Sequence, residues 1–115
     1  MAFTLVTLDN PGGYNKPDGT PANGTLIITL SDTLLNAGEV IEPTPITALI
    51  DNGKIVNSSY QPLQLVANND PGTTPVGSNY KFELTLDSSQ FITFRAVISN
   101  ASPTVDISTL EPIIL

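Results

Sequence analysis

The carboxylates are the side chains best suited to chemistry in this sequence, because it contains no histidine and no cysteine. A Ser-His-Asp triad, a Cys-His pair and the common zinc sites each need one of those two residue types. Two carboxylates can still act together as general acid and general base. The aspartates available for such a pair are Asp9, Asp18, Asp51, Asp70 and Asp87. Each has Asn, Gly, Pro or Ser beside it, which is typical of turns, and we therefore expect no enzyme.

Two short segments offer the oxygen ligands that calcium prefers, Asn68-Asn69-Asp70 and Asp9-Asn10. Neither segment has the spacing of an EF-hand loop. Because Asx residues in loops commonly form turns, the pattern predicts turn formation at both places and no metal ion. The sequence also lacks a Gly-rich phosphate loop, so we expect no cofactor.

The tyrosines raise the alternative of a carbohydrate-binding surface, because an exposed aromatic ring can stack on a sugar. The three candidates are Tyr14, Tyr60 and Tyr80. Tyr80 falls in the core-facing register of a predicted strand, and tryptophan is absent. Carbohydrate binding therefore stays an alternative rather than the main hypothesis.

The charge balance is one-sided, with four Lys and Arg against eleven Asp and Glu, a net charge of −7. Nucleic acid is an unfavourable partner for such a chain, because phosphate binding depends on clustered Lys and Arg. The same deficit argues against an anionic membrane surface. No apolar run approaches the roughly 18 residues of a membrane-spanning helix. No signal peptide is visible at the N-terminus, which predicts a soluble protein made in the cytoplasm.

The elements that must position these side chains are predicted to be short β-strands. The 115 residues are about the size of one domain. Their apolar residues alternate in short runs broken by turn residues, which is typical of antiparallel sandwiches and barrels. We expect one all-β domain, residues 1–115, folded as an antiparallel β-sandwich of about seven strands. Residues 1–23 would form an N-terminal strand and loop, and residues 104–115 a C-terminal strand or docking tail.

Individual strands and turns can also be placed. Tyr80–Leu86 has the most regular alternation in the chain and should be central to the core. Phe91–Ile98 is expected to pair with it across a short turn. Asn52-Gly53 lies between two apolar runs and strongly indicates a hairpin, because both residues tolerate positive φ. A break in the following strand is expected near Pro62.

Three segments have no regular alternation or carry prolines. Residues 31–38 are predicted to form a loop, with a single helical turn as the alternative. Residues 39–45 include Pro43 and Pro45, so they can form only an edge or a bulged segment. Residues 68–79 are expected to form a long, exposed loop.

The C-terminal segment is the first feature with functional weight, because it closes on Ile113, Ile114 and Leu115. Chain ends are usually poorly ordered unless they are tied down. One interpretation is a last strand docked on the sheet of the same chain. The other is that part of this segment binds a neighbouring subunit or another protein, as exposed apolar surfaces often do.

Residues 24–113 resemble a known family. The segments that carry the resemblance are Gly24–Ser31 (GTLIITLS), Glu42–Lys54 (EPTPITALIDNGK), Leu63–Tyr80 (LQLVANNDPGTTPVGSNY) and Thr104–Ile113 (TVDISTLEPI). Together they resemble the small β domain of many tailed-bacteriophage virion proteins, often the N-terminal module of minor tail or fibre-like proteins. The most specific signal combines the NDPGTTP loop, followed by an aromatic strand, with the closing VDISTLEP. The resemblance implies an immunoglobulin-like or transthyretin-like sandwich, no catalytic role and a place on the virion.

The function expected from this resemblance is assembly. Longer tail proteins continue after the closing motif into a shaft or receptor-binding part, whereas this sequence stops there, which favours an accessory role. We expect a capsid decoration protein or a small tail or fibre-base subunit, made in the host bacterial cytoplasm and located in the virion. Its partners would be other virion proteins, in a homo-oligomer or a symmetric multi-copy array. The expected interface residues are Phe3, Leu5, Ile113, Ile114 and Leu115. A carbohydrate-binding or host-surface adhesion module is the alternative.

Overall fold

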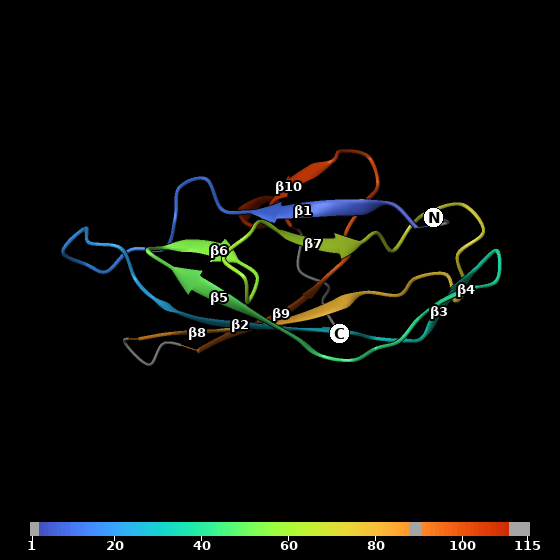
Figure 1. Ribbon diagram of the computed structural model, residues 1–115, viewed down its shortest axis with the longest axis horizontal. Coiled ribbons are helices and arrows are strands. Elements are labelled where there is room, and N and C mark those ends of the chain that lie inside the picture. Colours follow the sequence, from blue (N-terminus) through green and yellow to red (C-terminus); the bar gives the residue numbers. More distant parts are fainter. Residues whose placement is uncertain (1–2, 88–90, 111–115) are drawn as a thin grey trace.

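The structure is a computed structural model that describes residues 3–87 and 91–110, and these residues are almost entirely β (Figure 1). They form ten strands and one 3-10 helical turn, η1 (Ile107–Thr109). The strands are β1 (Leu5–Asp9), β2 (Gly24–Leu30), β3 (Leu34–Asn36), β4 (Glu39–Ile41), β5 (Ile46–Asp51), β6 (Lys54–Val56), β7 (Leu63–Val66), β8 (Tyr80–Leu86), β9 (Phe91–Ala96) and β10 (Thr104–Asp106). The predicted all-β, sandwich-like class is confirmed.

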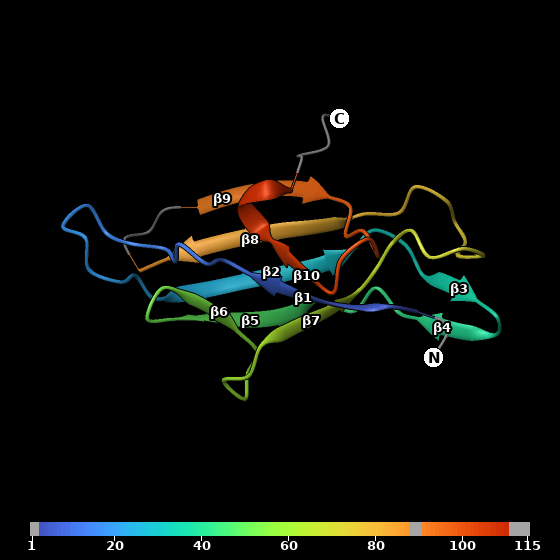
Figure 2. The same ribbon diagram turned by 90° about the horizontal axis from the view of Figure 1, so that it is seen from above.

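The strands form two layers of unequal size. The larger sheet has five strands in the order β6-β5-β2-β8-β9, and the smaller has three in the order β10-β1-β7 (Figures 1 and 2). A separate hairpin of β3 and β4 extends from one end of the molecule. Every strand pair is antiparallel except β1 and β10, which are parallel. Because the two sheets differ in width, they cannot cover each other completely.

The core lies between the two sheets and follows the period-2 alternation of the central strands. In β8, Tyr80, Phe82, Leu84 and Leu86 are all buried, as the alternation predicts. Phe82 is fully buried, and its ring stacks on Phe94 of β9 with the centroids 5.0 Å apart. Complete burial of such a side chain contributes roughly 1.5 to 3 kcal/mol. The predicted pairing of this strand with the one after it is also confirmed.

The predicted Asn-Gly hairpin connects β5 to β6. Asn52 and Gly53 have φ angles of 51° and 82°, so both adopt the left-handed conformation that a two-residue turn of this kind needs. Gly53 is required for a second reason, because a Cβ there would lie 2.7 Å from the carbonyl oxygen of Tyr14. The N-terminal loop therefore packs directly on this turn.

The break expected near Pro62 marks a change of sheet. Before it, β6 belongs to the larger sheet, and after it β7 belongs to the smaller one. The described residues form ten strands rather than about seven, in part because residues 31–41 add a hairpin.

The prediction of a loop over residues 31–38 is wrong for its second half. Leu34–Asn36 forms β3, which pairs with β4 through a turn at Ala37 and Gly38. Leu34 is fully buried, and Asn36 donates hydrogen bonds to the Pro71 carbonyl and the Thr73 hydroxyl. These contacts come from residues more than 30 positions away, so the local pattern did not contain them.

The prediction that residues 68–79 form an exposed loop is wrong in part. Asn68, Asp70, Thr73 and Ser78 are buried, with exposed fractions between 1% and 8%. The loop turns inward because these polar side chains have hydrogen-bond partners there. Val76, by contrast, is 93% exposed.

Candidate functional site

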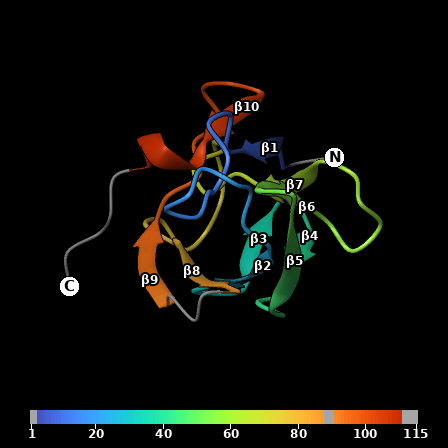
Figure 3. The ribbon, with the colours of Figure 1, turned by 90° about the vertical axis from the view of Figure 1, so that its left-hand side faces the viewer.

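The unequal sheets leave an open edge on one side of the sandwich. Figure 3, an end-on view, shows β7 and β5 on one side of the molecule and β9 and η1 on the other. Between β7 and β5 lies a groove of about 140 Å³. We call it the edge groove. Its apolar lining is formed by Leu5, Ile28, Leu30, Ile41, Ile46, Leu65 and Val66, and the other residues around it are Glu42, Thr44, Gln64 and Tyr80.

The groove is apolar because Ile46, an inward-facing residue of β5, is left uncovered. Ile46 belongs to the inward-facing set of β5, together with Ala48 and Ile50. Ala48 and Ile50 are buried at 0% and 2% exposure, but Ile46 is 40% exposed. Within the described residues the smaller sheet ends at β7, so none of its strands covers this end of β5. Leu5 of β1, on the facing sheet, is 41% exposed.

Tyr80 contributes a polar contact beside this apolar lining. Its hydroxyl donates a hydrogen bond of 2.7 Å to the carbonyl oxygen of Val66 in β7. Burial raises the pKa of Tyr80 above its usual value, so the phenol stays protonated and acts as a donor. The bond links the larger sheet to the smaller one next to the groove. Tyr80 is therefore a structural residue, as its core-facing register predicted.

Asp70, one of the predicted calcium-ligand candidates, is held by hydrogen bonds within the chain. Its two carboxylate oxygens accept from the backbone N–H and the hydroxyl of Thr4, each at 2.7 Å, and from the Asn100 side chain at 2.9 Å. Burial alone would raise the pKa of Asp70, but these hydrogen bonds together lower it. The carboxylate therefore ties the N-terminal strand to the loop after β9.

The other members of this segment are used in the same way. Asn68 accepts from the backbone N–H of Ile98 at 2.8 Å and donates to the Ser78 hydroxyl at 3.1 Å. Asn69 accepts from the backbone N–H of Asn100 at 2.7 Å. In the part of the chain that the structure describes, no three Asp or Glu side chains lie close enough together to hold a metal ion.

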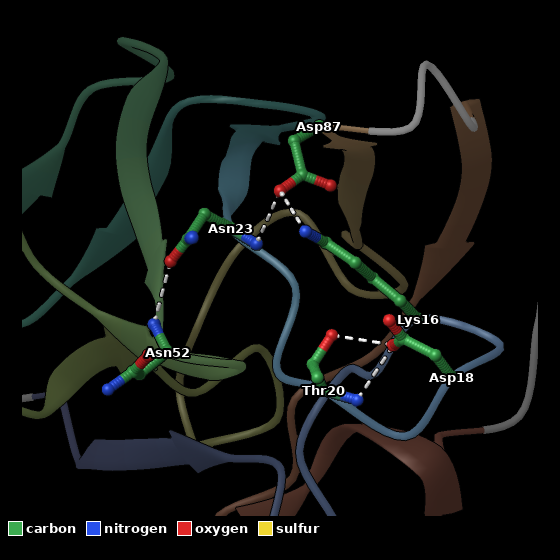
Figure 4. A network of polar contacts seen from close by, with 6 residues as sticks. All are labelled: Lys16, Asp18, Thr20, Asn23, Asn52 and Asp87. Atoms are coloured by element: carbon green, nitrogen blue, oxygen red, sulfur yellow. Dashed lines mark hydrogen bonds and ion pairs between the residues drawn. The ribbon is translucent and has the colours of Figure 1, made fainter.

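The opposite end of the sheet has a second polar network, shown in Figure 4. Lys16 Nζ lies 3.7 Å from Asp87 Oδ2, which also accepts from the backbone N–H of Asn23 at 3.3 Å. The side-chain oxygen of Asn23 accepts from the backbone N–H of Asn52 at 2.9 Å. The network fastens the N-terminal loop to the end of β8 and to the β5–β6 turn.

Of the other candidate aspartates, Asp18 lies in a turn, whereas Asp9 and Asp51 are the last residues of strands β1 and β5. Asp18 accepts from the hydroxyl and the backbone N–H of Thr20, and these two bonds lower its pKa (Figure 4). Asp9 accepts from the backbone N–H of Asn10. Asp51 flanks the Asn-Gly turn. The predicted turn role is confirmed for Asp18, while Asp9 and Asp51 lie at strand ends next to turns.

The predicted interface residues fall in different environments. Phe3 is a core residue with 3% exposure, so it has almost no surface to offer a partner. Leu5 lines the edge groove and is exposed. Ile113, Ile114 and Leu115 lie outside the described residues. The C-terminal strand expected within residues 104–115 is present as β10, paired with β1 of the same chain.

The carbohydrate alternative rests on Tyr60. It is 64% exposed and borders a shallow depression of about 510 Å³, together with Asp9, Lys54 and Thr104. Lys54 Nζ donates to the carbonyl oxygens of Asn10 and Pro11, so this ammonium group is already engaged.

Tyr14 is more enclosed than Tyr60. Burial, followed by the nearby charge of Asp106, raises its pKa.

Neither a family model, nor a curated protein, nor a solved structure matches this chain. Within the described ranges, the chain has no helix of the length and apolar character needed to cross a membrane.

Sequence reasoning identified Leu5 but missed the other side of the edge groove. Ile46 fits the alternation of an ordinary strand, and alternation tells only which face a residue occupies. The signal that was available is Pro43 and Pro45, which indicate an edge position immediately before β5. Gln64 and Val66 carried no comparable signal.

Proposed function

We propose that this chain is a structural protein of a bacteriophage virion, acting through protein–protein contacts as a capsid decoration protein or a small tail or fibre-base subunit. The observation that carries the assembly role is the edge groove, an apolar surface left open between two sheets. Exposed apolar surfaces rimmed by polar residues are typical of protein interaction sites. Partners would be other virion proteins, so the protein would be made in the host cytoplasm and incorporated into particles.

The use of the polar side chains supports an assembly role over catalysis. Asp70, Asn68 and Asp87 bind groups of the fold itself. Activated acids and bases usually show pKa values shifted toward neutrality in a cleft. The pKa of Asp70 is instead lowered by its hydrogen bonds, which favours a structural carboxylate.

The assignment to a phage particle rests on the resemblance. One of its two most specific segments, residues 69–75, lies in the inward-turned loop, and the part of the other that the structure describes runs from β10 through η1 to Leu110. A resemblance carried by such positions supports a shared domain type. The net charge of −7 would help to keep free subunits soluble before assembly.

Mass spectrometry of purified virions tests the proposal, with copy number measured against the major capsid protein. Hundreds of copies would indicate capsid decoration, and a handful would indicate the tail or fibre base. Absence from particles would overturn the virion role.

The edge groove can be tested in the same particles by comparing Ile46→Asp with Ile92→Asp. Both residues are exposed to nearly the same extent, 40% and 41%, but Ile92 lies on β9 at the other edge of the larger sheet. Loss of incorporation for Ile46→Asp alone is the expected result. Equal incorporation of both variants would remove the edge groove from the proposal.

A carbohydrate-binding module is the second candidate, favoured by the exposed ring of Tyr60 beside Asp9. A glycan array with the wild type and Tyr60→Ala tests it. Binding that disappears in the variant would support this candidate, and an array without hits would count against it.

A further inference from the structure

The edge groove is bordered by a strand whose outer edge has no strand partner among the described residues. Among the described strands, β7 pairs with β1 only. The N–H of Ala67 donates to the Thr4 carbonyl, which sets the ladder between the two strands. In an antiparallel ladder every second residue turns its N–H and C=O away from the partner, and here these are Gln64 and Val66. The Val66 carbonyl accepts from Tyr80, so the N–H of Val66 and both groups of Gln64 face the open edge.

The facing strand, β5, is also only partly paired at this edge. β6 pairs with Leu49, Ile50 and Asp51 and does not extend further along the strand. The first half of β5 therefore has β2 on one side and the groove on the other. A segment in extended conformation can add to the free edge of β7 and place alternate side chains over Ile46. This is the geometry of strand addition to a sheet edge.

The size of the groove restricts what it can take. Its volume, about 140 Å³, is close to the roughly 150 Å³ of an engineered apolar cavity that binds benzene. That is room for one large aliphatic side chain. The occupant should therefore be an extended segment with a branched aliphatic residue at its centre and little charge. Glu42 beside the groove disfavours an acidic side chain at that position.

One segment of this chain has that chemistry and lies outside the described residues. Residues 111–115 read Glu-Pro-Ile-Ile-Leu, with three consecutive aliphatic side chains after a proline. Proline at the start of an added strand is tolerated, because it need not donate to the ladder.

The same segment starts across the molecule from the groove of its own chain. It continues from η1, which lies on the β9 side of the molecule, whereas β7 and β5 lie on the other side (Figures 2 and 3). Five extended residues span at most about 18 Å. The molecule measures 30 Å and 23 Å across its two shorter axes, and both exceed that reach.

We infer that residues 111–115 of one copy dock in the edge groove of a second copy, adding a strand to the free edge of β7. The contact is head-to-tail, because each copy offers its C-terminal segment on one side and its groove on the other. Such heterologous contacts form rings when the rotation closes and filaments when it does not. The inference names the partner at the groove and rests on the assembly role proposed above.

Sedimentation velocity of the full chain from micromolar to millimolar concentration tests this inference. Four variants are compared with the wild type: Ile46→Asp in the groove, Ile114→Asp in the segment, and Ile92→Asp and Val76→Asp as exposed controls outside both. Urea unfolding of each variant verifies that it is folded. We expect concentration-dependent association of the wild type and both controls. We expect Ile46→Asp and Ile114→Asp each to associate at least tenfold more weakly than the wild type.

Mixing the two weakened variants gives the most specific readout. Ile46→Asp keeps an intact segment and Ile114→Asp keeps an intact groove, so the mixture should form a one-to-one pair that neither forms alone. An interface of two identical patches would not be restored by mixing, and that result would overturn the inference. A wild type that stays monomeric at millimolar concentration would also overturn it, and would indicate a different protein as the occupant.

The failure of this inference can be told apart from failure of the proposed function. A protein abundant in virions but monomeric in solution would retain the virion role and lose the head-to-tail contact. A protein absent from virions that still associates through segment and groove would lose the virion role and retain the contact.

Discussion

Two regions of the molecule differ in whether their side chains and strand edges are covered by the rest of the chain. In the loop from Asn68 to Ser78, buried polar side chains bind Thr4, Ile98 and Asn100 from distant parts of the chain. In the edge groove, the side chains of Leu5 and Ile46 remain about 40% exposed, and β7 has a free edge. The first region is closed by its own residues, and the second is left open.

This contrast shows which groups of the protein are available to a partner. The aspartates and asparagines that suggested chemistry in the sequence are mostly engaged within the fold. The aliphatic residues and the strand edge that suggested nothing more than a sandwich are the groups left accessible. Function is therefore expected from apolar burial and backbone pairing rather than from charged side chains.

The largest effect is expected from opening the closed region with Asp70→Ala. The substitution removes a buried carboxylate that accepts three hydrogen bonds. It leaves the backbone N–H of Thr4 without its hydrogen-bond acceptor. We expect the free energy of unfolding to fall by about 1.5 to 3 kcal/mol, measured by urea denaturation. Asp18→Ala, in an exposed turn, is the matched control and should leave the urea midpoint nearly unchanged. Equal midpoints for both variants would contradict a structural role for Asp70.

The pH dependence of stability should reveal the same carboxylate. The pKa of Asp70 is lowered in the folded state. Its stabilisation is therefore complete above the unfolded pKa, near 4, and is lost as the pH falls through the folded value. The difference in unfolding free energy between wild type and Asp70→Asn should be constant above about pH 5 and shrink at lower pH. A difference that stays the same down to acid pH would rule out this linkage.

A smaller effect is expected at the junction of the two regions, where Tyr80 meets Val66. Tyr80→Phe removes the 2.7 Å hydrogen bond and should lower the free energy of unfolding by about 1 kcal/mol. The loss is smaller than for Asp70 because the bond is between neutral groups. Tyr60→Phe, at an exposed ring, serves as the control in the same urea titrations. If Tyr80→Phe is as stable as the wild type, water fully replaces the phenol as the hydrogen-bond donor to the Val66 carbonyl.

The smallest effect on the folded monomer is expected inside the edge groove. Ile46→Thr keeps the β-branched shape of a side chain that is 40% exposed, so stability should change by less than about 0.5 kcal/mol. Ile50→Thr, at 2% exposure on the same face of β5, should cost several times more in the same thermal or urea unfolding experiment. Similar losses for both would mean that the groove end of β5 is packed as tightly as the core.

The local features of this fold follow from short-range patterns in the sequence. Alternation placed Phe82 and its neighbours on the inner face of β8, because successive residues of a strand point to opposite faces. The Asn52-Gly53 pair determined the β5–β6 turn, since both residues adopt positive φ. The break at Pro62 was visible because proline cannot donate to a ladder. Each of these rules acts over a few neighbouring residues.

Where the molecule is closed and where it is open depends instead on contacts between distant parts of the chain. Asp70 is bound by Thr4, 66 positions away, and no local pattern encodes such a partner. Ile46 alternates like Ile50, yet it is exposed because the smaller sheet ends at β7. Alternation specifies the face of a side chain, whereas its burial depends on how many strands the opposite sheet contributes. For that reason the edge groove, on which the proposed function rests, appeared only in the folded chain.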